Sequence, residues 1–336
     1  MIRPFGLRDI SWVRELQPEG TAFDVAYWLF HPFSPAFSAC LGYFWRHRPT
    51  VMTSVFCQER AECGDGFVQI RTGKHPDEWE LSFLAPALTE SEQNKRIWLD
   101  LLAHLMVFGA LCGVRRIYAR VREDPMNERV LREAGFSVVT REEIFVLKRP
   151  LDPVPAPAGL REVRDSDRRR LDEFVQQVVP PLVYKANGAN FQCSFLPHPL
   201  LALFLPKREF VWDERGRILA YFSSCTFQGV QWVEAVVRPE IRGDVGPCIH
   251  HVVVNRGRST EVKAYVRVQE YCKGLGWVLR TLDFEPWARQ VIMVAHTTAN
   301  ALVSSTMTLK HLQGCVEARP HPSASKAIAS QERKWL

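Results

Sequence analysis

The sequence predicts a duplicated α/β (α+β) fold, because its 336 residues contain one pattern twice. Residues 118–146 match residues 265–294: Tyr, Arg, Val and Glu recur at one spacing, then Phe, Arg, Ile and Val at a spacing one residue longer. Residues 2–16 match residues 160–174 in the same way. Two repeated sections in the same order indicate a repeat of one structural unit. The length agrees, since domains usually contain about 100–200 residues.

Composition shifts divide the chain into four parts. We expect a domain over residues 1–149 and a second over residues 159–296. Four prolines within residues 150–158 indicate a stiff linker between them. Residues 297–336 are rich in Ser, Thr, Ala and His with weak periodicity, which predicts a loosely packed or disordered tail.

Charge and cysteine usage narrow the class of protein. The net charge of +6 is mild, and the short run Arg168-Arg169-Arg170 is interleaved with acids, so the sequence gives little support for a nucleic-acid partner. Nine irregularly spaced cysteines without a Cys-x-x-Cys pair favour reduced thiols over disulfides or a metal site. The N-terminus lacks a signal-peptide pattern, and the longest apolar stretch, 97–114, is interrupted by Asp100 and His104. These features predict a cytoplasmic protein without a membrane partner.

Periodicity predicts the same elements in each half. In the first half we expect a strand at the front, helices over 20–48, and then three strands over 50–59, 67–71 and 78–86. A long helix over 97–111, a strand over 116–122, a short helix over 125–134 and a closing hairpin over 136–147 follow. In the second half we expect a helix over 171–179, strands over 209–212, 218–222 and 232–239, and then a helix shorter and poorer than its counterpart.

This order of elements resembles the GNAT superfamily of acyl-CoA-dependent N-acyltransferases. The turn Asp213-Glu-Arg-Gly216 between two strands and Gly135-Phe136 after a short helix add to the resemblance, which covers residues 1–296 as two tandem copies. It implies a mixed, mostly antiparallel twisted sheet flanked by helices in each half. It also implies acetyl-CoA or another acyl-CoA as cofactor and a small-molecule or peptide amine as acceptor.

The resemblance directs attention to the loop before the long helix. In the family the preceding strand splays from its neighbour and pairs with pantetheine, and a loop of the form Arg/Gln-x-x-Gly-x-Gly/Ala holds the pyrophosphate. Glycines let backbone N–H groups approach phosphates, and a helix N-terminus adds partial positive charge. The first-half loop, residues 86–96, has no glycine and contains Glu90 and Glu92. We therefore favour a helix start capped by Thr89 or Ser91 over a phosphate site.

The second-half loop, residues 239–247, is closer to the family pattern. It keeps Arg242, Gly243, Gly246 and a proline suited to a first helical turn. Asp244 must point away if CoA binds, because two unit charges at ~4 Å repel by roughly 4 kcal/mol near a surface. A tight Arg-Gly-Asp turn is an equal alternative. The predicted cofactor-binding residues are Val236, Val237, Arg238, Arg242, Gly243, Val245 and Gly246.

Acyl transfer to an amine also needs a base and an acid. Many relatives place a Tyr acid on the short helix before Gly-Phe, but Leu131 and Leu279 occupy that place here. Glu80 and Glu234 are the candidate bases. The sequence distance from Glu80 to Pro86 and that from Glu234 to the equivalent Pro239 differ by one residue. Successive strand residues point to opposite faces, so we expect the two acids on opposite sides of the sheet, with Glu234 the preferred base.

Other polar and aromatic residues have plainer interpretations. We expect Tyr118 and Tyr265 to lie in the core. The adjacent His250 and His251 cannot converge on one metal from a regular helix, so no metal site is predicted.

Two hypotheses of different classes remain. The leading one is an acyl-CoA-dependent N-acyltransferase whose second half binds the cofactor and whose first half is degenerate and mainly structural. The alternative is a catalytically inactive GNAT-like scaffold that acts as a ligand-binding or protein-interaction module. A binding module acting through scattered arginines is a minor third hypothesis.

Overall fold

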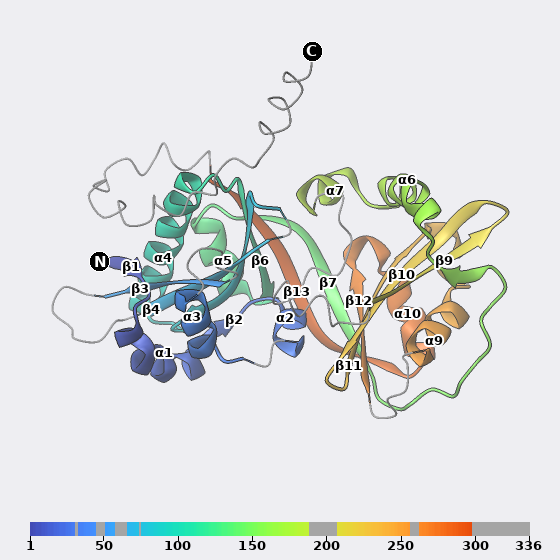
Figure 1. Ribbon diagram of the computed structural model, residues 1–336, viewed down its shortest axis with the longest axis horizontal. Helices are drawn as coiled ribbons and strands as arrows, with labels where there is room; N and C mark the ends of the chain where they lie inside the picture. The colour runs from blue at the N-terminus through green and yellow to red at the C-terminus, as the bar shows by residue number, and fades with distance from the viewer. Residues whose placement is uncertain are drawn as a thin grey trace, which may run out of the picture.

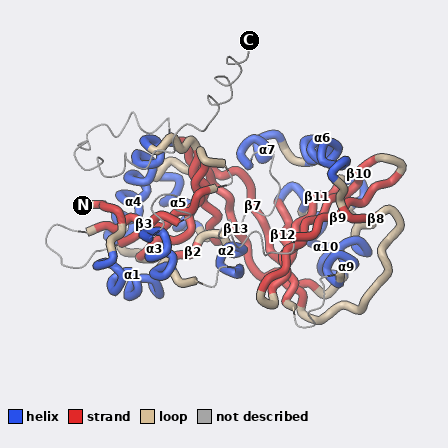
Figure 2. Tube along the Cα trace, viewed as in Figure 1, coloured by secondary structure: helices blue, strands red, loops and turns tan. Residues whose placement is uncertain are grey.

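One continuous twisted sheet runs through the whole molecule (Figures 1 and 2). The computed structural model describes residues 1–30, 33–44, 51–57, 66–73, 75–187, 207–255 and 262–297. Within these residues, 13 strands form the sheet in the order β1-β3-β4-β5-β6-β13-β7-β12-β11-β10-β9-β8, with β2 added beside β5. The predicted tail from residue 298 onward lies outside the described residues.

The strand order of the first half repeats in the second half, read inward from each edge. The first half contains β1 (Ile2–Pro4), β2 (Thr21–Ala22), β3 (Val51–Phe56), β4 (Gly66–Thr72), β5 (Glu78–Ala85) and β6 (Arg116–Arg122). The second half contains β8 (Leu160–Glu162), β9 (Lys207–Glu214), β10 (Arg217–Phe227), β11 (Val230–Val237) and β12 (Lys263–Gln269). The central strands are β7 (Ser137–Leu147) and β13 (Phe284–His296). This arrangement confirms the predicted α/β fold with a mixed, mostly antiparallel sheet.

The helices cover both faces of the sheet. One face, which we call the α4–α9 face, packs against α4 (Glu92–Leu111), α5 (Pro125–Glu133), α9 (Gly246–Val254) and α10 (Gly274–Thr281). The opposite face, the α2 face, packs against α1 (Ile10–Leu16), α2 (Val25–Phe30), α3 (Pro35–Phe44), α6 (Arg168–Val178) and α7 (Pro181–Asn187). As predicted, α9 is shorter than α4, with 9 residues against 20. No helix among the described residues is long and apolar enough to cross a membrane.

The repeated front section forms the same structure twice. In each half a short strand leads through a 3-10 turn into a helix. Arg3 pairs with Asp9 at 2.5 Å, and Arg161 pairs with Asp167 at 2.6 Å, six residues along in both cases. The same acid accepts a backbone N–H of the preceding turn in each half. This local ion pair explains why these two residue types recur at this spacing.

The closing strands are exchanged between the halves. β7, from the first half of the sequence, pairs antiparallel with β12, while β13 pairs antiparallel with β6. β7 and β13 also pair with each other. The predicted hairpin over 136–147 is wrong: this segment is one strand of 11 residues. It contains no Gly, Pro, Asn or Asp to form a tight turn, so the chain continues straight into the other half.

Each hydrophobic core therefore contains residues from both halves of the sequence. Val291, Met293 and Ala295 of β13 are buried in the core under α4 and α5. Phe145 and Leu147 of β7 are buried in the core under α9 and α10. Neither half completes its own core, and the sheet joins the two halves into one packed unit.

Candidate active site

Two V-shaped openings interrupt the sheet. β5 and β6 are parallel and pair only from Glu78 to Glu80, after which they diverge. β11 and β12 pair from Val230 to Glu234 and then diverge in the same way. In each half the strand on one side of the opening leads into the helix that follows it, α4 or α9. Beyond these positions β6 and β12 no longer supply the hydrogen-bond partners of β5 and β11 on that side.

The second opening leads to the predicted phosphate loop. The loop forms a 3-10 turn, Pro239–Ile241, and Val245 then caps α9, with Pro247 in its first turn. A Cβ built on Gly243 meets no atom within 4 Å, so the backbone there faces open space. Asp244 is exposed. The N-terminus of α9, where the first-turn N–H groups have no partner within the helix itself, thus lies beside an accessible glycine.

A groove begins at this loop and runs between α9 and α10. Its volume is about 660 Å³. Its lining includes Gly243, Gly246 and Pro247 at the start of α9, Trp277 and Thr281 of α10, and residues 154–157 of the linker. Asp244 is not among its lining residues. The groove is large enough for part of a cofactor and meets the loop on its glycine side.

The remaining predicted cofactor residues lie around the opening in different ways. Val236 and Val237 are buried at the diverging end of β11. Arg238 is engaged on the α2 face, where it donates to the carbonyl of Ile218 at 2.9 Å and to Gln177 at 2.8 Å. Arg242 turns inward and donates to the carbonyl of Tyr271 at 2.7 Å. The structure therefore brings the glycines to the groove but directs both arginines elsewhere.

Tyr271 and Cys272 fill the second opening. They belong to the 3-10 turn Glu270–Cys272 that follows β12. The backbone N–H of Val237 donates to the Cys272 thiol. The Tyr271 ring contacts the cores on both faces of the sheet, which is possible only through the gap between the strands. Its hydroxyl is buried without a hydrogen-bond partner among the described residues, and burial raises the pKa of this phenol.

The two candidate bases lie on the same face, contrary to the sequence expectation. Glu80 and Glu234 each lie at the last paired position before the strands diverge. Glu80 pairs with Arg120 at 3.6 Å, and Glu234 pairs at 2.9 Å with Arg267, the equivalent residue of the repeat. The pairing of β4 with β5 shifts register around Ser82. This β-bulge adds one residue to β5, so counting from Pro86 assigned Glu80 to the wrong face.

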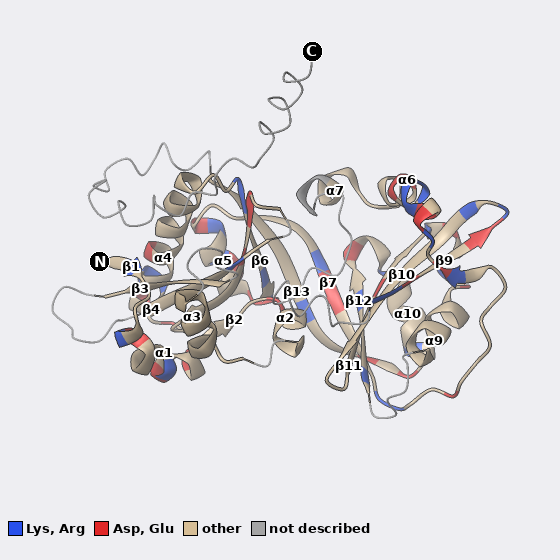
Figure 3. Cartoon of the chain, viewed as in Figure 1, with Lys and Arg blue, Asp and Glu red and all other residues tan. Residues whose placement is uncertain are grey.

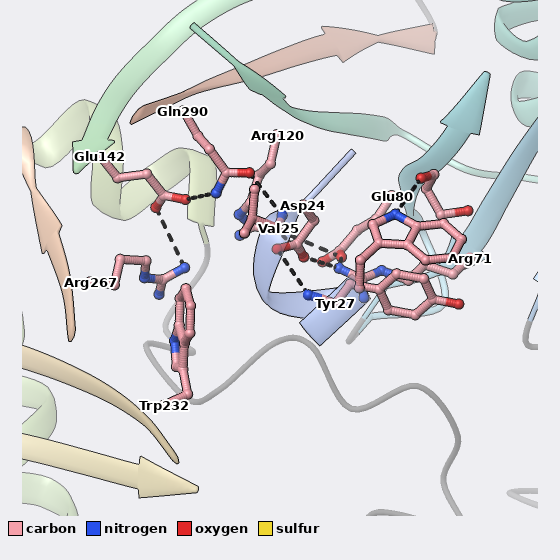
Figure 4. Close-up of polar contacts among 12 residues, drawn as sticks. Asp24, Val25, Tyr27, Arg71, Glu80, Arg120, Glu142, Trp232, Arg267 and Gln290 are labelled. Atoms are coloured by element: carbon pink, nitrogen blue, oxygen red, sulfur yellow. Dashed lines mark hydrogen bonds and ion pairs between the residues drawn. The ribbon is translucent and has the colours of Figure 1, made fainter. Parts of the chain in front are cut away.

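A buried network of charged and polar groups lies between these two acids at the centre of the sheet, and Figure 4 shows its members from Glu80 to Arg267. At the first opening, Arg71 pairs with both Asp24 and Glu80. Charged residues are visible along the central strand β7 (Figure 3). The network contains the acids Asp24, Glu80, Glu142 and Glu234 and the arginines Arg71, Arg120 and Arg267, all at most about one-tenth exposed.

Glu142 is the junction of this network. It accepts hydrogen bonds from Gln290 at 2.9 Å and Gln269 at 3.0 Å, and Arg267 lies 3.5 Å away. Gln290 in turn accepts from the backbone N–H of Val25 at 2.9 Å. Burial raises the pKa of Glu142 despite the nearby arginines. Glu234 also accepts from the indole of Trp232 at 3.1 Å, so its carboxylate is held in place at the apex of the second opening.

The leucines, tyrosines and histidines singled out in the sequence are buried or already engaged. Leu131 and Leu279 are fully buried in the two cores, so neither short helix has a polar group at that position. Tyr118 and Tyr265 are buried, as predicted. The ring nitrogens of His250 and His251 contact the linker carbonyls of Asp152 and Val154. No group of three or more metal-binding side chains occurs within the described ranges.

The first opening lacks the features of a phosphate loop. Asn94 and the Trp98 indole donate to the carbonyls of Ala87 and Pro86, so α4 side chains engage this loop internally. Ser91 is the N-cap residue of α4 and Glu92 its first residue. The predicted helix start therefore forms at Ser91, although the Ser91 side chain makes no capping hydrogen bond.

Comparisons with known proteins support the fold. No protein-family model matches the sequence, and no curated protein matches it either. Two solved structures share its architecture. A GCN5-related N-acetyltransferase from Sphaerobacter thermophilus has a TM-score of 0.54 at 13% identity and covers 88% of this chain and 95% of its own. A tandem GNAT protein from the clavulanic acid biosynthesis pathway has a TM-score of 0.50 at 16% identity and covers 88% of this chain and 98% of its own. The chain therefore has the fold of the GNAT N-acetyltransferases.

Proposed function

We propose that this protein is an acyl-CoA-dependent N-acyltransferase that binds its cofactor in the second half. Three features support this most: the β11–β12 opening, the glycine-containing N-terminus of α9 that follows β11, and the groove of about 660 Å³ lined by those glycines. The acceptor is an amine on a small molecule or peptide. We also propose the domain limits 1–149 and 159–296, with each domain completed by the other's closing strand.

The cofactor residues have separable tasks in this proposal. Gly243 and the first turn of α9 hold the pyrophosphate through backbone N–H groups. Val236 and Val237 offer to the pantetheine arm the edge of β11 that β12 has left, once the Cys272 thiol releases the N–H of Val237. The bound thioester supplies the activated acyl group. The Tyr271 side chain must move aside when the arm enters, because it now occupies the opening.

Glu234 is the proposed base. It lies at the apex of the opening, where the acyl group would be delivered, and Arg267 and Trp232 fix its orientation. A base at this point accepts the proton of an incoming ammonium, directly or through a water. Tyr118, Tyr265 and the two leucines of the short helices are core residues and supply no acid, so the CoA thiolate that leaves takes the proton that the attacking nitrogen loses as the amide forms.

The alternative function is an inactive scaffold that binds a ligand or protein. One observation favours it: Tyr271 and Cys272 already fill the second opening. The two proposals differ in a measurable way, because the scaffold gives no acyl transfer and need not bind acyl-CoA.

Calorimetric titration with acetyl-CoA tests the binding site. Gly243→Ala should leave the fold intact, since the added Cβ meets no protein atom within 4 Å, but it should weaken binding, because the Cβ would lie where the pyrophosphate approaches the backbone. Gly243→Glu should bind at least about tenfold more weakly, since like charges at ~4 Å repel by roughly 4 kcal/mol near a surface. Arg242→Glu should also weaken binding, while Arg169→Glu, the same charge change on a 90% exposed side chain, should not. Absence of binding at about 1 mM ligand, roughly −4 kcal/mol, would end the acyltransferase proposal.

Release of free thiol from acetyl-CoA in the presence of a panel of amines tests the reaction. Glu234→Gln should lower the rate by about 10²–10⁴-fold while leaving acetyl-CoA binding intact. Glu80→Gln, at the equivalent apex of the first half, is the matched control and should keep the rate. Equal losses in both variants would mean that Glu234 acts only through the buried network.

A further inference from the structure

We propose that residues 19–24 fill the first opening with the chain's own backbone, along the path that the acyl-CoA arm takes in the second half. The equivalence between the path of this segment and the path of the acyl-CoA arm rests on the proposed function. The first half then holds a socket for a segment of the same chain, and the protein is limited to one acyl-CoA per molecule.

The segment runs from the loop after β5 to the point where β5 and β6 diverge. Ala87, in the loop after β5, donates its backbone N–H to the carbonyl of Glu19 at 2.5 Å. Next along the route, Thr21 and Ala22 form β2, which pairs antiparallel with Leu84 and Phe83 of β5. β4 occupies the opposite edge of β5, so β2 takes the edge that β6 has left.

The segment then bridges the two diverging strands. Phe23 donates its N–H to the carbonyl of Ser82 on β5 at 3.0 Å. Asp24 donates its N–H to the carbonyl of Arg120 on β6 at 2.7 Å. The backbone groups that an extended ligand would use are therefore already paired, and a ligand would have to displace a bound segment to reach them.

The fit of the segment is close at Gly20. A Cβ at this position would lie 2.2 Å from Cε1 of Phe83 and 3.2 Å from the Cβ of Ala85. A side chain at Gly20 would therefore require the buried Phe83 ring or the segment itself to shift, which weakens the fit of the segment on β5.

Asp24 holds the C-terminal end of the segment 19–24 in place. Its φ of +59° turns the chain at the apex, a conformation that aspartate tolerates better than most residues. Its carboxylate pairs with Arg71 and lies 3.8 Å from Arg120. Although burial alone would raise it, the charges of these arginines hold the pKa of Asp24 below its ordinary value.

The segment also has a role outside its own opening, because it leads directly into α2. Ala26, Tyr27 and Phe30 of α2 pack on Trp232 and Tyr265 of the second half. The filled socket thus holds a helix of the first half against the α2 face of the second half, on the side where Glu234 projects.

Hydrogen exchange on the intact protein without ligand tests the socket. The amides of Phe23 and Asp24 should exchange at least about 100-fold more slowly than in an unstructured peptide. Gly20→Ala should reduce that protection at least about tenfold. Gly6→Ala is the matched control, since its Cβ would meet its nearest atom, Asp9 Oδ2, at 3.6 Å, and it should keep the protection. Unprotected Phe23 and Asp24 amides in wild type would overturn the inference.

Stoichiometry provides a second, separable test. Calorimetry should give one acetyl-CoA per chain, and ligand-induced protection should appear near Val237 and not at Leu84. Two equivalents, or new protection along β5, would overturn the socket. Complete absence of acetyl-CoA binding would overturn the proposed function instead, and the exchange of the Phe23 and Asp24 amides in the free protein would still decide the inference.

Discussion

Arg267 holds two buried carboxylates from different strands in one place. Its guanidinium lies 2.9 Å from Glu234 and 3.5 Å from Glu142, and its side chain is 11% exposed. Removing one partner of a buried ion pair leaves an uncompensated charge, which typically costs about 3–5 kcal/mol.

Arg267→Ala should therefore lower the free energy of unfolding by about 3–5 kcal/mol, measured by urea denaturation. Arg169→Ala removes an arginine that is 90% exposed and should change it by about 0.5 kcal/mol or less. Similar small effects in both variants would show that the network contributes little to stability.

Glu209 makes a pH-dependent contribution to stability. Burial alone would raise its pKa, but hydrogen bonds from Tyr221, Arg168 and Lys207 lower the pKa to about 2. A carboxyl group with a depressed folded-state pKa stabilises the protein above its unfolded pKa, about 4.5, and this contribution is lost as pH falls toward 2.

Glu209→Gln should thus destabilise the protein by about 1–3 kcal/mol at pH 6, with a difference from wild type that shrinks steadily between pH 5 and pH 2. Thermal or urea unfolding across this range measures it. A difference that stays constant with pH would contradict the assignment.

Sequence patterns over a few neighbouring residues predicted part of the proposed site. Residues that reach the openings from distant segments were missed. Gly243 and Gly246 could be found because a phosphate loop is contiguous in sequence. Glu234 could be found from its position on a strand. Asp24 and Tyr271 could not, since they enter the openings from segments distant in sequence or from an unremarkable turn. The bulge at Ser82 has no signature in residue type, and it reversed the expected side of one acid.

At the scale of elements, the exchange of β7 and β13 is the main departure from expectation. Alternation along residues 137–147 predicts a half-buried strand, but it does not state which strand will be its partner. The missing turn residues were the available clue. Apart from the closing hairpin, the order of elements was predicted correctly, because hydrophobic periodicity is local.

Met293 provides a test of this exchange. It belongs to β13, late in the sequence, yet it is fully buried in the core under α4 and α5. Met293→Ala should cost about 2–5 kcal/mol and increase hydrogen exchange in α4 and β6, elements of the first half. Increased exchange confined to α9 and α10 would contradict the exchanged arrangement.

At the scale of the whole molecule, the two halves should unfold together. Each core includes strands from both parts of the sequence, and β7 and β13 pair along their length. Urea denaturation followed by fluorescence and by circular dichroism should therefore give one coincident transition. Two separated transitions would mean that the halves are independent domains.

Separate expression of the two halves tests the same mutual dependence. Residues 1–149 alone lack β13, which leaves β6 as an open edge and removes Val291, Met293 and Ala295 from the core. This fragment should be unfolded or aggregated by size-exclusion chromatography, and co-expression with residues 150–336 should recover a 1:1 complex. A stable monomeric fragment would refute the mutual dependence.

The exchanged strands also bear on how a duplicated gene can diverge. After most duplications, the copy that loses its site can be deleted without harm to the other. Here the half without a phosphate loop still encodes β7, which lies between β12 and β13 in the half that keeps the glycines. Truncation would leave the second half without its closing strand, so selection on the ligand site that we propose there would also preserve the other half as a scaffold.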